Sequence, residues 1–261
     1  MHLLFDVGNT ETVVGLARPG TLDMVAHWRL STHMPRTADE VRVLLRALLA
    51  EAGHGDTPIE RAVVGSVVPR VTSVLVAALE TLAPGAVFTV EASSPLSVRL
   101  DVDEPLTVGA DRIVNTLAAA RLYGRDTIAV DLGTATTFDC ITADGVFQGG
   151  VIAPGVSVGL EWFSQRTAKL PRIGLELPER VIGRRTEDCM RSGVFWMAVD
   201  GVDGMVDRIR AEWGRAEPLV VATGGFSTLL GPHCRTVERV EPLLTLRGLM
   251  LAGGELSARG G

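Results

Sequence analysis

The sequence has few of the patterns that mark secreted, metal-binding, nucleic-acid-binding or membrane proteins. It contains 3 cysteines, widely separated and without a C-x-x-C pair, so we expect neither a zinc site nor a disulfide framework. It has no block of Lys or Arg and its net charge is −6, which argues against nucleic acid or an anionic membrane as the main partner. No apolar run is long enough to span a membrane, and the start of the chain lacks the basic region of a signal peptide. We therefore expect a cytoplasmic protein with no nucleic-acid and no membrane partner, in which Cys140 and Cys189 are core thiols.

Two common nucleotide-binding motifs are also missing. No G-x-x-x-x-G-K-[ST] occurs, which excludes a P-loop enzyme, and no G-x-G-x-x-G follows a strand-like run. The composition is nevertheless that of a folded protein, because 46% of the residues are hydrophobic and 21% are charged. A length of 261 residues allows one large domain or two of ordinary size.

One short motif is present twice. In each copy an apolar run ends in Asp, one further residue, Gly, and then small hydroxyl or amide residues. The apolar run 3–5 leads into DVGNT at 6–10, and the apolar run 127–130 leads into DLGTATT at 131–137. The second copy begins near the middle of the chain, which indicates two similar halves that face each other across a cleft.

Each copy has the chemistry of a phosphate-binding turn. Gly8 and Gly133 have no Cβ, so the backbone can turn tightly and approach a ligand closely. Threonine hydroxyls and free backbone N–H groups suit phosphate oxygens. Asp6 and Asp131 would repel a bare phosphate, but Mg²⁺ prefers one or two carboxylates together with water and phosphate oxygens. The pair therefore predicts a nucleotide and metal site; the alternative is two ordinary strand-end turns capped by Asp and Thr.

The remaining pattern predicts the order β-β-β-α-β-α-β in the first half and the same plan in the second. In the first half a helix is expected to begin at Thr37, because Thr37 and Glu40 have the spacing of a capping box and apolar residues then recur at helical spacing. The repeat predicts a duplicated α/β fold with the ligand in the cleft between the halves. The expected strands are 3–6, 12–17, 24–30, 61–68, 87–90, 127–130, 137–142, 146–152 and 219–222, and the expected helices include 157–169, 186–213 and 243–251.

A polar linking region, 91–108, separates the two halves and leads into a helix over about 109–123. The predicted domains are accordingly an N-terminal half, 1–108, and a C-terminal half, 109–261. Asp111 would lie in the first turn of the linking helix, where the helix end favours a carboxylate.

Asp111 and Asn115 are four residues apart and would share a face of that helix. Asp111 is therefore a candidate functional residue, although a helix-start Asp beside a surface Arg would have the same local sequence. The T-G-G at 223–225 suits a nucleoside lying flat against backbone, or is an ordinary strand-to-helix turn. The glycines at 149–150 either allow close approach of a ligand or form a bulge.

Six motifs in order resemble those of type III pantothenate kinases. They are DVGNT (6–10), VGADRIVN (108–115), DLGTATTFD (131–139), GGVIAPG (149–155), TAKLP (167–171) and TGG (223–225). The resemblance covers nearly the whole chain. It implies the superfamily of acetate and sugar kinases, Hsc70 and actin, and hence an α/β fold of duplicated actin-like (ribonuclease H-like) halves. It also implies phosphorylation of pantothenate with ATP, the first step toward coenzyme A, by a homodimer that needs Mg²⁺ and a monovalent cation such as K⁺ or NH₄⁺.

The resemblance also implies roles for individual residues. Asp111 would be the general base on the primary hydroxyl of pantothenate. Asp131 matches the ligand of the monovalent cation, and Asp6 would hold Mg²⁺ through water. The pantothenate-binding residues would be Gly109, Ala110, Asp111, Arg112 and Thr186. The ATP-binding residues would be Asp6, Val7, Gly8, Asn9, Thr10, Glu11, Thr12, Val13, Thr134, Gly224 and Gly225.

The chain departs from the family pattern at a few positions, and two alternatives therefore stay open. One is a non-catalytic accessory or regulatory protein on the same scaffold; intact Asp111 and both Asp-x-Gly turns argue against it. The other is a kinase of the same superfamily with another small acceptor. Val102 stands where the family often has an aromatic residue. Four further departures from the family pattern would only repack a helix or a dimer face: Gly159, Trp162, Phe163 and Met197.

Overall fold

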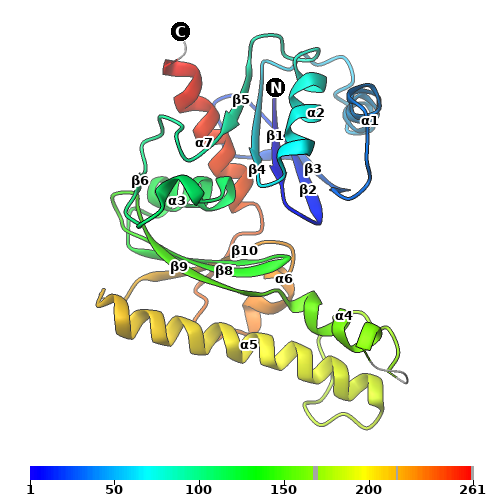
Figure 1. The fold of residues 1–261 in the computed structure, drawn as a ribbon, viewed down its shortest axis with the longest axis vertical. Helices are drawn as coiled ribbons and strands as arrows, with labels where there is room; N and C mark the ends of the chain where they lie inside the picture. The colour runs from blue at the N-terminus through cyan, green and yellow to red at the C-terminus, as the bar shows by residue number, and fades with distance from the viewer. Residues whose placement is uncertain (167–169, 216, 260–261) are drawn as a thin grey trace. The chain divides into compact units, whose positions relative to one another are not determined.

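The chain forms two compact units (Figure 1). The first comprises Met1–Arg121 and Thr245–Gly261, and the second comprises Leu122–Leu244. The predicted halves, 1–108 and 109–261, differ from these units because they group the linking helix and the C-terminal helix with the second sheet. The computed structural model describes residues 1–166, 170–215 and 217–259.

The sheet of the first unit has the strand order β3-β2-β1-β4-β5. β1 pairs antiparallel with β2 and β2 with β3, whereas β1 with β4 and β4 with β5 are parallel. This is the predicted order of three consecutive strands followed by two helical crossovers. The strands are β1 (His2–Val7), β2 (Glu11–Ala17), β3 (Met24–Ser31), β4 (Arg61–Ser66) and β5 (Val87–Val90).

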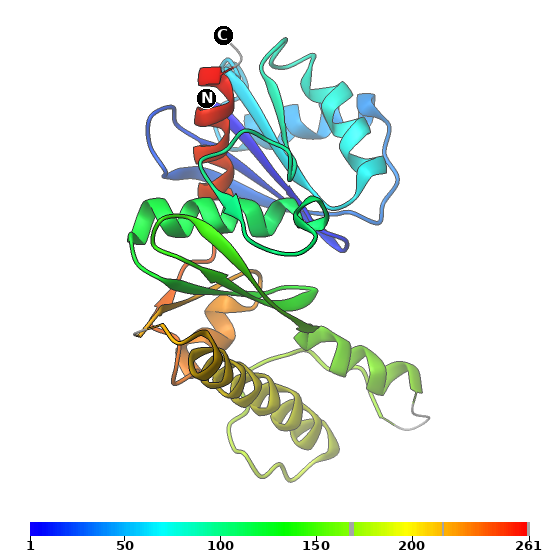
Figure 2. The same cartoon turned by 60° about the vertical axis from the view of Figure 1, so that its left-hand side comes forward.

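Helices cover both faces of this sheet (Figure 2). α1 begins at the predicted capping box, in which Glu40 N donates to the Thr37 hydroxyl and Thr37 N donates to the Glu40 carboxylate at 2.7 Å. Phe5 of β1 belongs to the core under α1 and α2. A Cβ on Gly65 of β4 would lie 3.0 Å from Leu249 of α7, which therefore covers the other face. The remaining elements of this part of the chain are α1 (Ala38–Glu51), α2 (Pro69–Leu79), β6 (Arg99–Leu100), η1 (Pro105–Thr107), α3 (Ala110–Tyr123) and α7 (Leu244–Arg259).

The strands of the second unit have the order β11-β10-β7-β8-β9. This order repeats the first sheet, with β7 to β11 in the places of β1 to β5. The pairing repeats as well, since β7–β8 and β8–β9 are antiparallel and β7–β10 and β10–β11 are parallel. The equivalence confirms the predicted fold of duplicated actin-like halves. The strands are β7 (Thr127–Leu132), β8 (Ala135–Ile141), β9 (Val146–Pro154), β10 (Leu219–Thr223) and β11 (Arg239–Val240).

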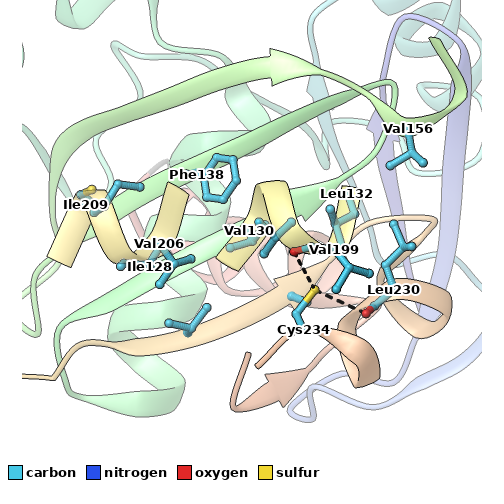
Figure 3. Packing of buried hydrophobic residues seen from close by; sticks show 14 of the residues in the cluster. Ile128, Val130, Leu132, Phe138, Val156, Val199, Val206, Ile209, Leu230 and Cys234 are labelled. Carbon is cyan, nitrogen blue, oxygen red and sulfur yellow. Dashed lines mark hydrogen bonds between the residues drawn. The ribbon is translucent and has the colours of Figure 1, made fainter. Parts of the chain in front are cut away.

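The long helix α5 closes the core of the second sheet (Figure 3). Val199 and Val206 of α5 are buried in one cluster with Ile128 and Val130 of β7. Figure 3 shows the Cys234 thiol in the same cluster, where it donates to the carbonyl oxygens of Leu230 at 3.4 Å and of Val199 at 4.0 Å. The helices of this unit are α4 (Val156–Arg166), α5 (Thr186–Trp213), the short α6 (Ser227–Leu230) and η2 (Gly231–His233).

Three details differ from expectation or fall outside the structure. Cys140 is buried as predicted, but Cys189 is exposed, so its prediction as a core thiol was wrong. Cys189 lies in the first turns of α5, where the next residue, Met190, is the one that points into the core. The predicted end of the helix 157–169 and part of the TAKLP motif lie at 167–169, outside the described residues.

In the described part of the chain, no helix has both the length and the apolar character needed to cross a membrane.

Candidate active site

The first Asp-containing turn is the β1–β2 hairpin. Asp6 is the penultimate residue of β1 and is half-buried. Gly8 N donates to Glu11 O at 3.0 Å, and a Cβ at position 8 would lie 3.1 Å from that oxygen. A residue without a Cβ therefore fits this turn best, and it leaves residues 9–10 exposed at the tip. All residues of the predicted phosphate-binding stretch, 6–13, lie in this one hairpin.

The β7–β8 hairpin repeats the same turn. Asp131 is the penultimate residue of β7, as Asp6 is of β1. Gly133 N donates to Ala135 O at 3.1 Å, and Thr134 is exposed at the tip. A Cβ on Gly155, just before α4, would overlap the carbonyl oxygen of Thr134. The chain that enters α4 therefore runs directly beside this turn.

The turn after β10 packs onto the second hairpin. Gly224 has a φ of 87°, and a Cβ on it would overlap Asp131 Oδ1 and lie 2.9 Å from the backbone of Leu132. Phe226 N donates to Leu132 O at 3.0 Å, which ties the two turns together. Only glycine combines this left-handed backbone with so close an approach. The second unit thus brings together four predicted site residues, Asp131, Thr134, Gly224 and Gly225.

Thr223 also belongs to this group, although the T-G-G motif in the sequence predicted roles only for its two glycines. It is the last residue of β10, pairs in register with Asp131 and is fully buried. Its hydroxyl has no hydrogen-bond partner among the described residues, and a buried polar group in that condition is costly unless another species binds it. The only signal in the sequence was a hydroxyl residue directly before Gly-Gly at a strand end, which by itself is weak.

The oxygen atoms of these turns suit hard cations. Asp131 offers a carboxylate and Thr223 a hydroxyl, which fits a monovalent cation because such cations prefer oxygen ligands. Among the described residues, no group of three or more His, Cys, Asp or Glu side chains could hold a metal ion. A divalent ion here would therefore depend on one or two carboxylates, water and ligand oxygens, which is the way Mg²⁺ binds beside phosphates. Asp6, at the end of β1, would be such a carboxylate.

The Gly-Ala-Asp-Arg motif forms the start of α3. Asp111 lies in the first turn, where the helix end favours a carboxylate, and its Oδ1 accepts a hydrogen bond from Arg112 N at 2.9 Å. A Cβ on Gly109 would lie 2.5 Å from Asp111 Oδ1 and 3.4 Å from Val67 Cγ1. The glycine therefore makes room for the carboxylate next to the end of β4. Ala110 is buried and anchors this end of the helix.

The predicted site residues divide between the two units. The hairpin 6–13 and the motif 109–112 belong to the first unit, and the group around Asp131 belongs to the second. Thr186, predicted to contact the substrate, is the exposed first residue of α5 in the second unit. The first unit contains the Asp6 hairpin and the acidic residue of α3, and the second unit contains the Asp131 hairpin.

Comparisons with known proteins relate the chain to one family. A sequence model described as type III pantothenate kinase matches residues 2–208. The type III pantothenate kinase of Rhizorhabdus wittichii is 43% identical over 256 residues, 95% of this chain and 96% of that protein. The type III pantothenate kinase of Pelobacter propionicus is 41% identical over 251 residues, 96% of this chain and 98% of that protein.

A solved structure shares the fold at much lower identity. It is the activator of the 2-hydroxyisocaproyl-CoA dehydratase from Clostridium difficile with bound ADPNP, with a TM-score of 0.54 and 12% identity over 99% of this chain and 96% of that one. This likeness concerns the fold alone, whereas the sequence matches extend over nearly the full length. The chain therefore belongs to the type III pantothenate kinase family.

Proposed function

We propose that this protein transfers the γ-phosphoryl group of ATP to the primary hydroxyl of pantothenate and forms 4′-phosphopantothenate, the first step of coenzyme A biosynthesis. The observation that carries the proposal is the equivalence of Asp6 and Asp131, at the same position of two equivalent hairpins in a chain of this family. A regulatory protein without catalysis would not need both carboxylates together with Asp111.

In this proposal the two hairpins hold the phosphates of ATP. The turn at 6–13 and Thr134 would donate from backbone N–H groups and hydroxyls, and Gly224 and Gly225 would lie by the nucleoside. Mg²⁺, held by Asp6 through water, would neutralise charge on the phosphates. Phosphoryl transfer needs alignment and charge neutralisation more than covalent help from the protein, and short hairpins tied by hydrogen bonds provide alignment.

Asp111 is the proposed general base. Arg112 N and the end of α3 hold its carboxylate in place, and a carboxylate so held can orient an alcohol and accept its proton as the bond to phosphorus forms. The Arg112 guanidinium would pair with the carboxylate of pantothenate, because its planar fork suits two parallel hydrogen bonds. Gly109 and Ala110 would lie along the substrate, and Thr186 would add a further contact.

A monovalent cation, K⁺ or NH₄⁺, is proposed at Asp131. Its positive charge would offset the carboxylate beside the phosphates, which would otherwise repel them. The buried hydroxyl of Thr223, paired in register with Asp131, supports the proposal because it offers a second oxygen ligand.

We also propose that the protein is a cytoplasmic homodimer. Large apolar side chains of the second unit are exposed: Ile152 of β9 is 66% exposed, Trp162 of α4 56% and Met197 of α5 78%. Exposed apolar side chains of this size are suited to burial at a contact between subunits. Cys140, Cys189 and Cys234 are not joined in disulfides, as expected in a reducing compartment. Met197→Glu should convert a dimer into a monomer, which light scattering measures. An unchanged mass would exclude Met197 from the interface.

Release of ADP from ATP tests the proposed reaction. With Mg²⁺ and K⁺ the release should require pantothenate, and replacement of K⁺ by Na⁺ should reduce it. Asp111→Asn should lower turnover at least about 100-fold, the usual contribution of a general base, while ATP binding in calorimetry stays nearly unchanged. Asp56→Asn, at an exposed loop position, is the matched control.

Two outcomes would count against the proposal. Near wild-type turnover of the Asp111→Asn variant would remove Asp111 from the base role. Absence of pantothenate-dependent ADP release, from folded wild-type protein that binds ATP, would overturn the proposed reaction and favour another acceptor or an accessory role.

A further inference from the structure

The first unit contains a cavity that lies apart from the acceptor site proposed around Asp111. It has a volume of about 250 Å³ and lies between α1, α2 and the segment 31–36 after β3. Leu45 and Leu75 in its wall belong to the core on the α1 and α2 face of the sheet. The start of α3 lies on the other face, where Ala110 packs over Gly65. The cavity is therefore distinct from the acceptor site proposed around Asp111.

The lining of this cavity combines apolar side chains with cations. Leu44, Val71 and Val74 line it together with Arg36 and Arg70, and no Asp or Glu of the described residues does. Sites for small molecules commonly have this composition, with apolar walls and a few polar groups that orient the ligand. The composition points to a ligand with an apolar body and a negative charge.

The two arginines are available to such a charge. Arg36 donates to Ser31 O at 3.0 Å, which holds its guanidinium at the wall, and Arg70 is exposed at the start of α2. Within the described part of the chain, neither guanidinium forms an ion pair with a carboxylate. Two acidic side chains of the neighbouring β2 and α1 form ion pairs with other arginines, Glu11 with Arg29 and Asp39 with Arg42. Glu40 is hydrogen-bonded to Thr37, and the charge of Arg36 helps to lower the pKa of its carboxyl without a direct ion pair.

We propose that this cavity is a binding site for a small carboxylate with an aliphatic body. The aliphatic part would lie between α1 and α2, and the carboxylate would lie against Arg36 and Arg70, since guanidinium and carboxylate pair well. At about 30 Å³ for each water-sized group, the volume holds roughly eight such groups, which makes hexanoate a suitable probe. Thr12 of the β1–β2 hairpin also lines the cavity, so the ligand would lie next to the proposed phosphate-binding turn.

Titration calorimetry of hexanoate into the full-length protein, without nucleotide or pantothenate, tests this site. We expect a Kd on the order of 1 mM, as for a ligand of this size. Hexanol and hexylammonium have the same aliphatic chain without the negative charge and should bind at least about tenfold more weakly. Equal binding of hexanol would indicate an apolar cavity without an anion site, and this result, or no binding of hexanoate at about 20 mM, would overturn the proposal.

Two variants locate the binding. Arg70→Gln should weaken hexanoate binding about tenfold through loss of a charged contact, and Val74→Phe should abolish it by filling the cavity. Arg46→Gln, on α1 but outside the lining, is the matched control and should bind as the wild type does. Since Arg70 is exposed, its replacement should leave folding intact, and unchanged affinity in Arg70→Gln would overturn the proposal. Because no ATP or pantothenate is present, the result is independent of the proposed kinase reaction.

Discussion

The hydroxyl oxygens of Thr12 and Thr32 lie 2.9 Å apart. Thr32 N also donates to Thr10 O at 3.0 Å, so the segment after β3 supports both the tip of the β1–β2 hairpin and the start of β2. Thr12 is buried, and its hydroxyl therefore needs a partner inside the protein. Thr32, which lies outside the phosphate-binding motif, thus stabilises the conformation of that motif.

Thr32→Val should weaken ATP binding without a large effect on turnover. The variant removes the partner of the Thr12 hydroxyl, a loss of about 1 kcal/mol, and the resulting looser hairpin should raise the KM for ATP about fivefold. Steady-state kinetics measures both constants. Thr21→Val, at an exposed position near the β2–β3 turn, is the control. An unchanged KM for ATP in Thr32→Val would contradict a supporting role.

Gly224→Ala should destabilise the second unit strongly. Gly224 has a φ of 87°, and its Cβ would overlap Asp131, so strain and overlap together should cost about 3 kcal/mol. Gly214→Ala is the matched control, because Gly214 has a φ of 65° but open space around its Cβ; it should cost only about 1 kcal/mol. Urea unfolding compares the two. Equal losses of unfolding free energy in the two variants would mean that the close packing of Gly224 on Asp131 adds nothing to stability.

Thr223→Val should remove the response of stability to potassium. If the buried hydroxyl of Thr223 binds the cation together with Asp131, K⁺ should raise the thermal midpoint of the wild type relative to Na⁺ through selective binding to the folded state. The valine variant is similar in shape and lacks only the oxygen ligand, so its midpoint should be the same in both salts. A K⁺ response that persists in the variant would show that Thr223 is not a ligand.

Glu255 of α7 connects the linking region with α3. Its carboxylate accepts hydrogen bonds from Ser97 N at 2.7 Å and from Arg121 Nη2 at 2.9 Å. Burial opposes ionisation, but the hydrogen bonds from Ser97 and the charge of Arg121 outweigh it and hold the pKa of this carboxyl below its ordinary value. The ionised carboxylate therefore stabilises the folded state.

Glu255→Gln should consequently show a pH-dependent loss of stability. Because the folded pKa is depressed, the stabilisation is fully present above the ordinary value of 4.5 and is lost as the pH falls through the lower folded pKa. Near neutral pH the variant should lose about 1 kcal/mol in urea unfolding, since Arg121 is half-exposed and water screens the pair. The difference from wild type should shrink in acid. If the difference in unfolding free energy between Glu255→Gln and wild type stays constant with pH, the ionic role is refuted. An equal loss of stability in the control variant Glu51→Gln would refute it as well.

The three cysteines should differ in reactivity. Burial, followed by the charges of Asp203 and Asp200, raises the pKa of the Cys234 thiol to about 12, so almost no thiolate is present near neutral pH. Cys189 is exposed and should react rapidly with a disulfide reagent. Cys189→Ser should lose this fast reaction, and all 3 thiols should react in denaturant. Fast modification of Cys234 in the native protein would contradict the packing around it.

Local patterns predicted most elements correctly. The capping box at Thr37 and Glu40 places the start of α1, and the strand-to-turn motifs place Asp6 and Asp131 at equivalent ends of β1 and β7. The C-terminal helix was predicted to end at 251 but continues to Arg259, past Gly253. A Cβ on Gly253 would overlap Val63 of β4. This glycine permits close packing of helix on sheet, which the sequence pattern does not distinguish from a helix end.

The sequence by itself determined the order of the longer strands and helices, the two Asp-x-Gly hairpins, the motif at the start of α3 and the family, because each depends on neighbouring residues in the chain. Only the tertiary structure decided that Thr223 and Gly224 meet Asp131, that Thr32 supports Thr12, and that Arg36 and Arg70 border one cavity. Strand pairing and helix packing bring together these residues, whose separation in the sequence leaves no local signal of their contact.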